Sequence, residues 1–191
     1  MQFQFNRHTN LEGLHAPFSP SQPYWLRYDD EKIAQTYRNK MAADRGTQLH
    51  DWAKKTIDLG IKQPKDKRSP NYTLYSYVND AIGFRMKTEV VLFYSLRSFG
   101  TADAISFRDN FLRIHDLKTG VTPVHMEQLL VYAALFCLEY NIKPGNIEME
   151  LRIYQNGEIQ QCNPTSEDIL PIMDWIVHVN KIADKVESKE V

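Results

Sequence analysis

The sequence has few cysteines, no excess of either charge and no long apolar run, and each absence excludes a class of protein. Two cysteines, Cys137 and Cys162, among 191 residues are too few for a disulfide scaffold or a four-cysteine iron–sulfur site. With 23 basic and 24 acidic side chains the formal net charge is −1, so any attraction for a polyanion must come from a local patch. No apolar run approaches the roughly 20 residues that a membrane span requires.

The N-terminal residues also lack the basic start and apolar stretch of a signal peptide. We therefore expect a cytoplasmic protein with reduced thiols and no membrane partner, with Cys137 in the core. The length is enough for one domain with a sizeable core, and the sequence contains no repeat or low-complexity tract. We expect a single domain over residues 1–191, in which 1–45 form an N-terminal segment and helix, 46–162 the catalytic core and 163–191 a C-terminal helix.

Apolar spacing and turn residues predict the order of helices and strands. Helical patterns cover residues 29–43, 47–59, 72–84, 126–140 and about 166 onwards, with Gly46 expected to separate the first two. Short β-rich segments cover 89–96, 101–108, 111–118, 147–154 and 158–162. The first three strands are expected to form an antiparallel meander, and the apolar helix over 126–140 to pack on it. The sequence therefore predicts an α/β fold with a central mixed sheet flanked by helices, plus an N-terminal helical segment.

The third predicted strand carries a pair of charged residues at one end. Leu112, Ile114, Asp116 and Lys118 alternate with other residues, so they share one face of the strand. A short turn joins this strand to the previous one, which allows Asp103 to lie beside Asp116 across the ladder. Two converging carboxylates are suited to a hard divalent cation such as Mg²⁺, and Lys118 could stabilise or help generate a hydroxide there.

Structural explanations compete with this interpretation. An isolated Asp-x-Lys pair on a strand is usually an edge salt bridge, and Asp103 with Asp116 is also compatible with a solvated end of the sheet. His115 and His125 are more simply explained as surface or capping residues than as ligands. The metal-site hypothesis therefore depends on further residues elsewhere in the chain.

Such residues are present as short motifs in a fixed order. They are Gly46-x-x-x-His50, Glu89 at the start of a strand, Gly100-x-x-Asp103, Asp116-x-Lys118 followed by Thr119-Gly120, and Gln128-x-x-x-Tyr132. Together they resemble the PD-(D/E)XK nuclease superfamily, specifically its RecB-like and phage exonuclease-like branch, over roughly residues 46–154. The resemblance implies a restriction-endonuclease-like core and metal-dependent hydrolysis of DNA.

The resemblance also implies a role for each motif residue. Asp103, Asp116 and the Leu117 carbonyl would hold Mg²⁺ or Mn²⁺, with His50 and Glu89 completing the coordination or its surroundings. Lys118 would position the nucleophile and offset developing charge. Gln128 and Tyr132, one helical turn apart, would orient Lys118 or the substrate phosphate. In isolation, His50 would be a core histidine, Gln128 ordinary helix-end polarity and Tyr132 a core residue. The iron–sulfur members of the branch carry four cysteines that this chain lacks, so no cluster is expected.

A locally basic stretch follows His50 and could grip backbone phosphates. Its cations are Lys54, Lys55, Lys62, Lys65, Lys67 and Arg68. An equally good explanation is a solvated lysine-rich loop. Aromatic residues near the N-terminus could stack unpaired bases or, more simply, pack over the core; they are Phe18, Tyr24, Trp25 and Tyr28.

Three functions are compatible with these observations. The resemblance favours a DNA exonuclease of phage or recombination type, for which a homo-oligomer or a recombination or phage partner protein is conceivable. A structure-selective or restriction-type endonuclease is the alternative, although no separate DNA-reading domain is visible. A non-catalytic DNA-binding or interaction protein on the same fold is the third, against which the retained Asp103, Asp116 and Lys118 argue.

Overall fold

The computed structural model describes residues 9, 16–121 and 125–190. The chain divides into two compact units, residues 1–45 and 46–191. The first unit contains the 3₁₀ helix η2 (Pro23–Arg27) and the start of the long helix α1 (Asp30–Asp58), and the second contains the end of α1 and all other elements. Most of the first fifteen residues lie outside the described part of the chain.

The second unit is an α/β fold built on one five-stranded mixed sheet. Its strands are β1 (Lys87–Ser95), β2 (Ser98–Arg108), β3 (Phe111–Leu117), β4 (Glu148–Gln155) and β5 (Glu158–Cys162), in that spatial order. Only β3 and β4 are parallel, and the other neighbours are antiparallel. The predicted meander and mixed sheet are confirmed.

Two-residue turns fix two of the antiparallel pairs. Asp109 and Asn110 between β2 and β3 have φ angles of 51° and 57°, and Asn156 and Gly157 between β4 and β5 have 50° and 84°. Positive φ at both central positions is typical of the type I′ turn, whose twist matches that of a β-hairpin. Asn, Asp and Gly tolerate this conformation best, so the turn residues set the register of both pairs.

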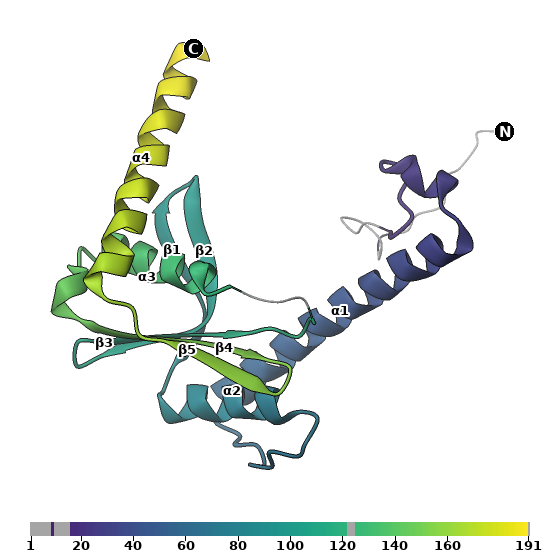
Figure 1. Ribbon diagram of the computed structural model, residues 1–191, viewed down its shortest axis with the longest axis horizontal. Helices are drawn as coiled ribbons and strands as arrows, with labels where there is room; N and C mark the ends of the chain where they lie inside the picture. Colours follow the sequence, from purple (N-terminus) through teal and green to yellow (C-terminus); the bar gives the residue numbers. More distant parts are fainter. Residues whose placement is uncertain (1–8, 10–15, 122–124, 191) are drawn as a thin grey trace. The chain divides into compact units, whose positions relative to one another are not determined.

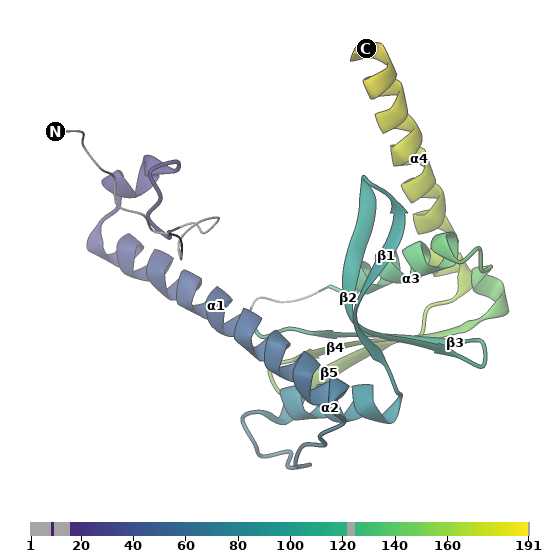
Figure 2. The same cartoon turned by 180° about the vertical axis from the view of Figure 1, so that it is seen from behind.

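Helices cover both faces of the sheet (Figures 1 and 2). The helix α3 (Glu127–Glu139) makes the crossover between the parallel strands β3 and β4, after which the short η3 (Pro144–Asn146) leads into β4. One hydrophobic core lies between α3, the sheet and α4 (Ser166–Glu190), and includes buried Cys137 as predicted. A second core lies on the opposite face, under α2 (Tyr72–Gly83) and the end of α1. No helix in the described residues is long and apolar enough to cross a membrane.

The predicted interruption at Gly46 is wrong, because α1 runs through it without a break. A glycine inside a helix costs only about 1 kcal/mol relative to alanine, and the flanking alanine, arginine, glutamine and leucine residues favour helix. Gly46 is buried, and a Cβ atom on it would lie 2.8 Å from the Thr119 hydroxyl. The glycine therefore permits a close approach between α1 and the loop after β3 rather than ending the helix.

Candidate active site

Asp103 and Asp116 lie at the same end of the β2–β3 ladder. The last paired positions are Ala104 and His115, and the two aspartates are the next residue on each strand. Asp103 Oδ2 accepts a hydrogen bond of 3.0 Å from the backbone N–H of Leu117. This bond ties the Asp103 side chain to the strand that carries Asp116, so the convergence expected from the short turn is present.

Lys118 connects the carboxylates to α3. Its Nζ lies 3.1 Å and 3.0 Å from the two carboxylate oxygens of Asp116 and donates to Gln128 Oε1 at 2.9 Å. Gln128 Nε2 in turn donates to the Tyr132 hydroxyl at 3.1 Å, and the Tyr132 ring packs against Gly100, where a Cβ atom would lie 2.9 Å from the ring carbon Cε1. The motif residues of β2, β3 and α3 thus form one continuous chain of contacts.

His50 approaches the carboxylates from α1. Its Nδ1 lies 3.5 Å from Asp103 Oδ2, and both side chains are half-buried. This distance is too long for a good hydrogen bond, but it allows both groups to face one cation.

Glu89 stands on β1 at the position opposite Asp103. The neighbouring ladder pairs are Thr88 with Ala104 and Val90 with Ala102. Glu89 is exposed and has a φ of 50°, which departs from strand geometry. A glutamate in this conformation is uncommon and occurs where the surrounding structure imposes it. The backbone here therefore turns out of the regular ladder beside the two aspartates.

The site carries more negative than positive charge. Burial, and secondly the Asp116 carboxylate, raise the pKa of Asp103 above its ordinary value, while the Leu117 N–H, His50 and Lys118 oppose that rise. Asp116 is 3% exposed, and its Oδ2 accepts no hydrogen bond from any described residue, although Lys118 lies at ion-pair distance. A buried carboxylate oxygen without a hydrogen bond is stabilised by a cation. The site thus suits an additional cation.

The donor set fits a hard divalent ion. Asp103 and Asp116 supply carboxylate oxygens, and His50 supplies an imidazole. Leu117 directly follows Asp116, and because its side chain is buried in the second core, its backbone carbonyl is the group it can offer to a cation. Oxygen ligands of this kind are those that Mg²⁺ and Mn²⁺ prefer. Within residues 9, 16–121 and 125–190, no three His, Cys, Asp or Glu side chains already stand in a metal-holding arrangement.

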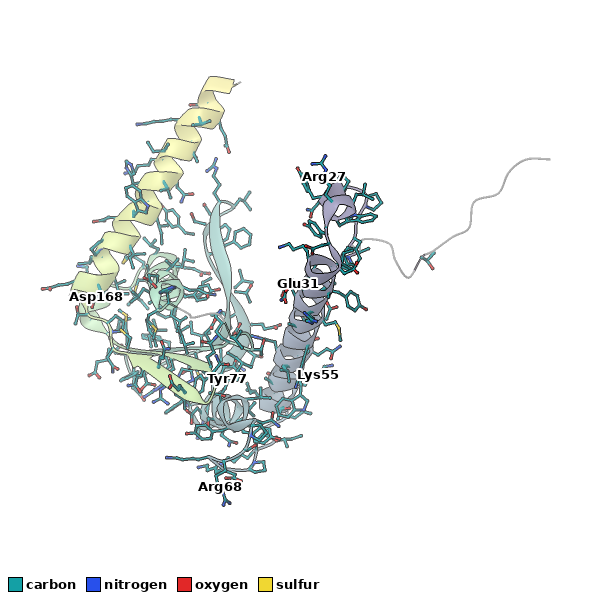
Figure 3. All side chains as sticks on the ribbon, turned by 45° about the vertical axis from the view of Figure 1, so that its right-hand side comes forward. Arg27, Glu31, Lys55, Arg68, Tyr77 and Asp168 are labelled. Carbon is teal, nitrogen blue, oxygen red and sulfur yellow. The ribbon has the colours of Figure 1, made fainter. Side chains whose placement is uncertain are left out.

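The predicted DNA-contacting cations are spread over two places. Lys54, on α1, pairs with Asp58 at 2.9 Å, which raises the pKa of the lysine, and the negative charge of Glu89 raises that pKa further. The remaining residues are exposed; they are Lys55 on α1 and Lys62, Lys65, Lys67 and Arg68 on the loop before α2. That loop lies on the side of α2 that faces away from the sheet, with Arg68 pointing outward (Figure 3). Lys54 therefore lies within electrostatic reach of Glu89, whereas the loop cations lie on the far side of α2 from the sheet (Figures 1 and 2).

Sequence patterns did not reveal a second group of polar and charged residues, which lies on the α2 face of the sheet. His115, expected at the surface, is fully buried on the α2 face, with its Nδ1 3.2 Å from the Tyr154 hydroxyl. Alternation of residues put it there, because its neighbours Ile114 and Asp116 face α3. Burial lowers the pKa of His115, so the imidazole is neutral. His125, by contrast, is exposed as expected.

Tyr77 on α2 is another neighbour that the sequence did not reveal. Its ring packs edge-on against Tyr154 at 5.5 Å and points toward the sheet (Figure 3). Burial, and then the charges of Asp103 and Asp116, raise its pKa, so the hydroxyl stays protonated beside the site. Its place within the helix predicted over residues 72–84 did not indicate this position.

Comparison of the chain with protein-family models, with curated proteins and with solved structures found no match.

Proposed function

We propose that this protein is a metal-dependent DNA nuclease with a restriction-endonuclease-like core, and that Asp103, Asp116 and Lys118 form its active centre. The single observation that carries the proposal is the convergence of two aspartates at one end of the β2–β3 ladder, with Lys118 in contact with one of them. The order of β1–β3, the α3 crossover and the parallel β4 is also that of the nuclease family whose motifs the sequence resembles.

Each residue has a part in phosphodiester hydrolysis. Asp103 and Asp116 would hold Mg²⁺ or Mn²⁺, which when bound lowers the pKa of water and offsets charge on the phosphate. Lys118 uses two of its three N–H donors on Asp116 and Gln128, which leaves one for a water molecule or a phosphate oxygen. Gln128, held by Tyr132, fixes the direction of the Lys118 side chain. His50 faces Asp103 from α1 and completes the set.

An exonuclease is favoured over an endonuclease by the resemblance to the phage exonuclease-like branch. Contacts to the DNA backbone would come from Lys54 near the site and from the exposed cations of α1 and the following loop. On the same resemblance, we propose that the protein assembles into a homo-oligomer or binds a recombination protein.

The test is hydrolysis of end-labelled linear duplex, single-stranded and closed circular DNA, in Mg²⁺, Mn²⁺ or EDTA. We expect metal-dependent loss of linear DNA with the circle spared, abolished in Lys118→Ala and retained in Lys143→Ala, an exposed lysine before η3. Cleavage of the circle would assign the protein to the endonuclease alternative. Folded protein with no activity on any substrate in either metal would overturn the proposal in favour of a binding role.

A further inference from the structure

The β1–β2 hairpin presents an exposed apolar surface on the side that does not pack on α3. Its inner side is occupied by buried Leu92 and Ala102. Three apolar side chains project from the outer side, namely Val91 (53% exposed), Phe93 (42%) and Phe99 (60%). Phe93 and Phe99 are cross-strand partners, with ring centroids 6.5 Å apart, so they form one aromatic surface.

Contacts on the inner side and at the turn hold this hairpin in place. The Phe93 backbone N–H donates to Glu139 on α3 at 2.7 Å, and Asn180 on α4 donates to Ser98 at 2.7 Å. At the turn, Arg97 pairs with Asp184 at 2.9 Å and with Glu187. Figure 1 shows the hairpin alongside α3 and α4. The aromatic side chains are thus exposed on a braced support, which lowers the entropy lost when they bind a ligand.

The aromatic surface lies on the same two strands as the proposed active centre. Phe99 pairs with Phe93 and Thr101 with Val91, and Asp103, opposite Glu89, follows two residues further along β2. Four residues of strand separate Phe99 from Asp103, which is roughly 13 Å. That is about the length of four stacked nucleotides at ~3.4 Å each.

The chemistry of the surface favours bases over phosphates. None of Val91, Phe93 and Phe99 carries a charge, and the nearest cation at the turn, Arg97, is engaged by two carboxylates of α4. Aromatic rings on a rigid support stack unpaired bases without regard to sequence. A double helix hides its base faces, so a single strand is the nucleic acid that fits.

We propose that Val91, Phe93 and Phe99 form a stacking surface for the unpaired bases of a nucleic-acid strand that enters the active centre at Asp103. This inference rests on the proposed nuclease function and adds to it the substrate class, a single-stranded end. The aromatic-rich N-terminal segment is not needed for it.

The test measures binding in EDTA, where hydrolysis plays no part. A short thymidine oligonucleotide containing one 2-aminopurine is titrated with the full chain, and its fluorescence reports stacking. We expect the double variant Phe93→Ala/Phe99→Ala to bind at least about tenfold more weakly than the wild type and to lose the quenching. Trp175→Ala is the matched control, since Trp175 is an equally exposed aromatic residue on α4, and it is expected to bind normally.

Two further variants keep the test independent of folding. Phe99→Trp retains a stacking ring and should preserve affinity, whereas Phe99→Leu retains apolar area without an aromatic ring and should lose it. Unchanged affinity in the double variant or in Phe99→Leu would overturn the inference, as would equal losses in Trp175→Ala. A wild-type dimer that the double variant converts to monomer in sedimentation would also overturn it, by showing that the surface binds a second copy. Failure of the nuclease proposal is separate, since it appears as absence of hydrolysis by the wild type.

Discussion

The two faces of β3 and β4 both bury charged residues, but only one face balances them. On the α2 face, Glu150 lies 3.3 Å from Arg113 and 2.9 Å from Arg152, and Arg152 reaches Asp80 at 3.0 Å. Tyr154 also donates to Asp80 at 2.7 Å. Two guanidinium groups therefore face two carboxylates, and the neutral His115 adds no charge.

At the end of the other face, negative charges outnumber positive ones. Asp103 and Asp116 share one ammonium group, that of Lys118, and Glu89 adds a third carboxylate at the next strand position. His115 and Asp116 are adjacent on β3, yet His115 belongs to the group whose charges balance and Asp116 to the group whose charges do not. A balanced network serves the fold, whereas an unbalanced one costs stability and is retained where a ligand supplies the missing charge. This difference supports placing function at Asp116 rather than at Glu150.

Asp116→Asn should have the largest effect, and on activity rather than on stability. Removing a carboxylate that holds the metal is expected to lower the hydrolysis rate by about 10³-fold. The free energy of unfolding in EDTA should stay within about 1 kcal/mol of the wild type, because the substitution also removes repulsion between the buried Asp116 and the half-buried Asp103 carboxylate. Hydrolysis assays and urea denaturation measure the two effects. A stability loss of several kcal/mol would show that Asp116 is structural.

Glu150→Gln should show the opposite pattern. It leaves the partly buried Arg113 and Arg152 without their shared, buried carboxylate, and breaking a buried ion pair in this way costs about 3 kcal/mol. Urea denaturation should therefore show a large loss of stability. Residual activity measured per folded molecule, well below the unfolding transition, should be unaffected. Retained stability would contradict the structural role of the network.

Much of the fold was predictable because its determinants are local. The Asp109-Asn110 and Asn156-Gly157 turns, the alternating strands and the apolar run of α3 each act over a few residues, and the structure confirms them. Gly46 was misjudged because its tolerance inside α1 depends on helix formers around it and on a close approach by Thr119, a residue far along the chain.

The candidate site was predictable only in part, for the same physical reason. The proximity of Asp103 and Asp116 follows from the two-residue loop between β2 and β3. The contact between Gln128 and Tyr132 follows from helix geometry, because they are four residues apart on α3. The Glu150 network joins α2, β3 and β4, and no local pattern encodes which arginine meets which carboxylate. The exposed outer side of the hairpin was not predictable for a related reason, since residues on both of its sides are apolar and only the packing of α3 decides which side is buried.

The low pKa of Glu150 predicts a specific loss of stability in acid. The imidazole of His115 and then the guanidinium of Arg152 hold the Glu150 pKa at about 2, below its ordinary 4.5. Because the folded pKa is depressed, the stabilisation is fully present above pH 4.5 and is lost as the pH falls toward 2. Denaturation curves of the wild type and Glu150→Gln should therefore converge over this interval. Parallel curves would show that Glu150 is not held ionised by its partners.

Metal should stabilise the unbalanced site and leave the balanced network unaffected. At ten to a hundred times the dissociation constant, Mg²⁺ is expected to add about 1.4–2.7 kcal/mol, which corresponds to a rise in Tm of roughly 3–10 °C. Asp116→Asn should lose this rise, while an equivalent shift should persist in Glu150→Gln from its lower starting point. An equal rise in Asp116→Asn would place the ion elsewhere.

The smallest expected effect comes from Gly100→Ala, which reaches Lys118 only through other residues. The new Cβ atom would lie 2.9 Å from Tyr132 Cε1, too close for the ring to keep its place. Displacement of Tyr132 breaks its hydrogen bond to Gln128 and frees the amide that holds Lys118. Since a hydrogen bond contributes about 1 kcal/mol, we expect the hydrolysis rate to fall about two- to tenfold, with KM unchanged.

Gly83→Ala is the matched control, because no atom lies within 4 Å of its Cβ position. Tyr132→Phe removes the same hydrogen bond without displacing the ring, so its rate should fall to a similar level. If Tyr132→Phe retains full activity while Gly100→Ala does not, the loss comes from distortion of β2 beside Asp103 rather than from the direction of Lys118.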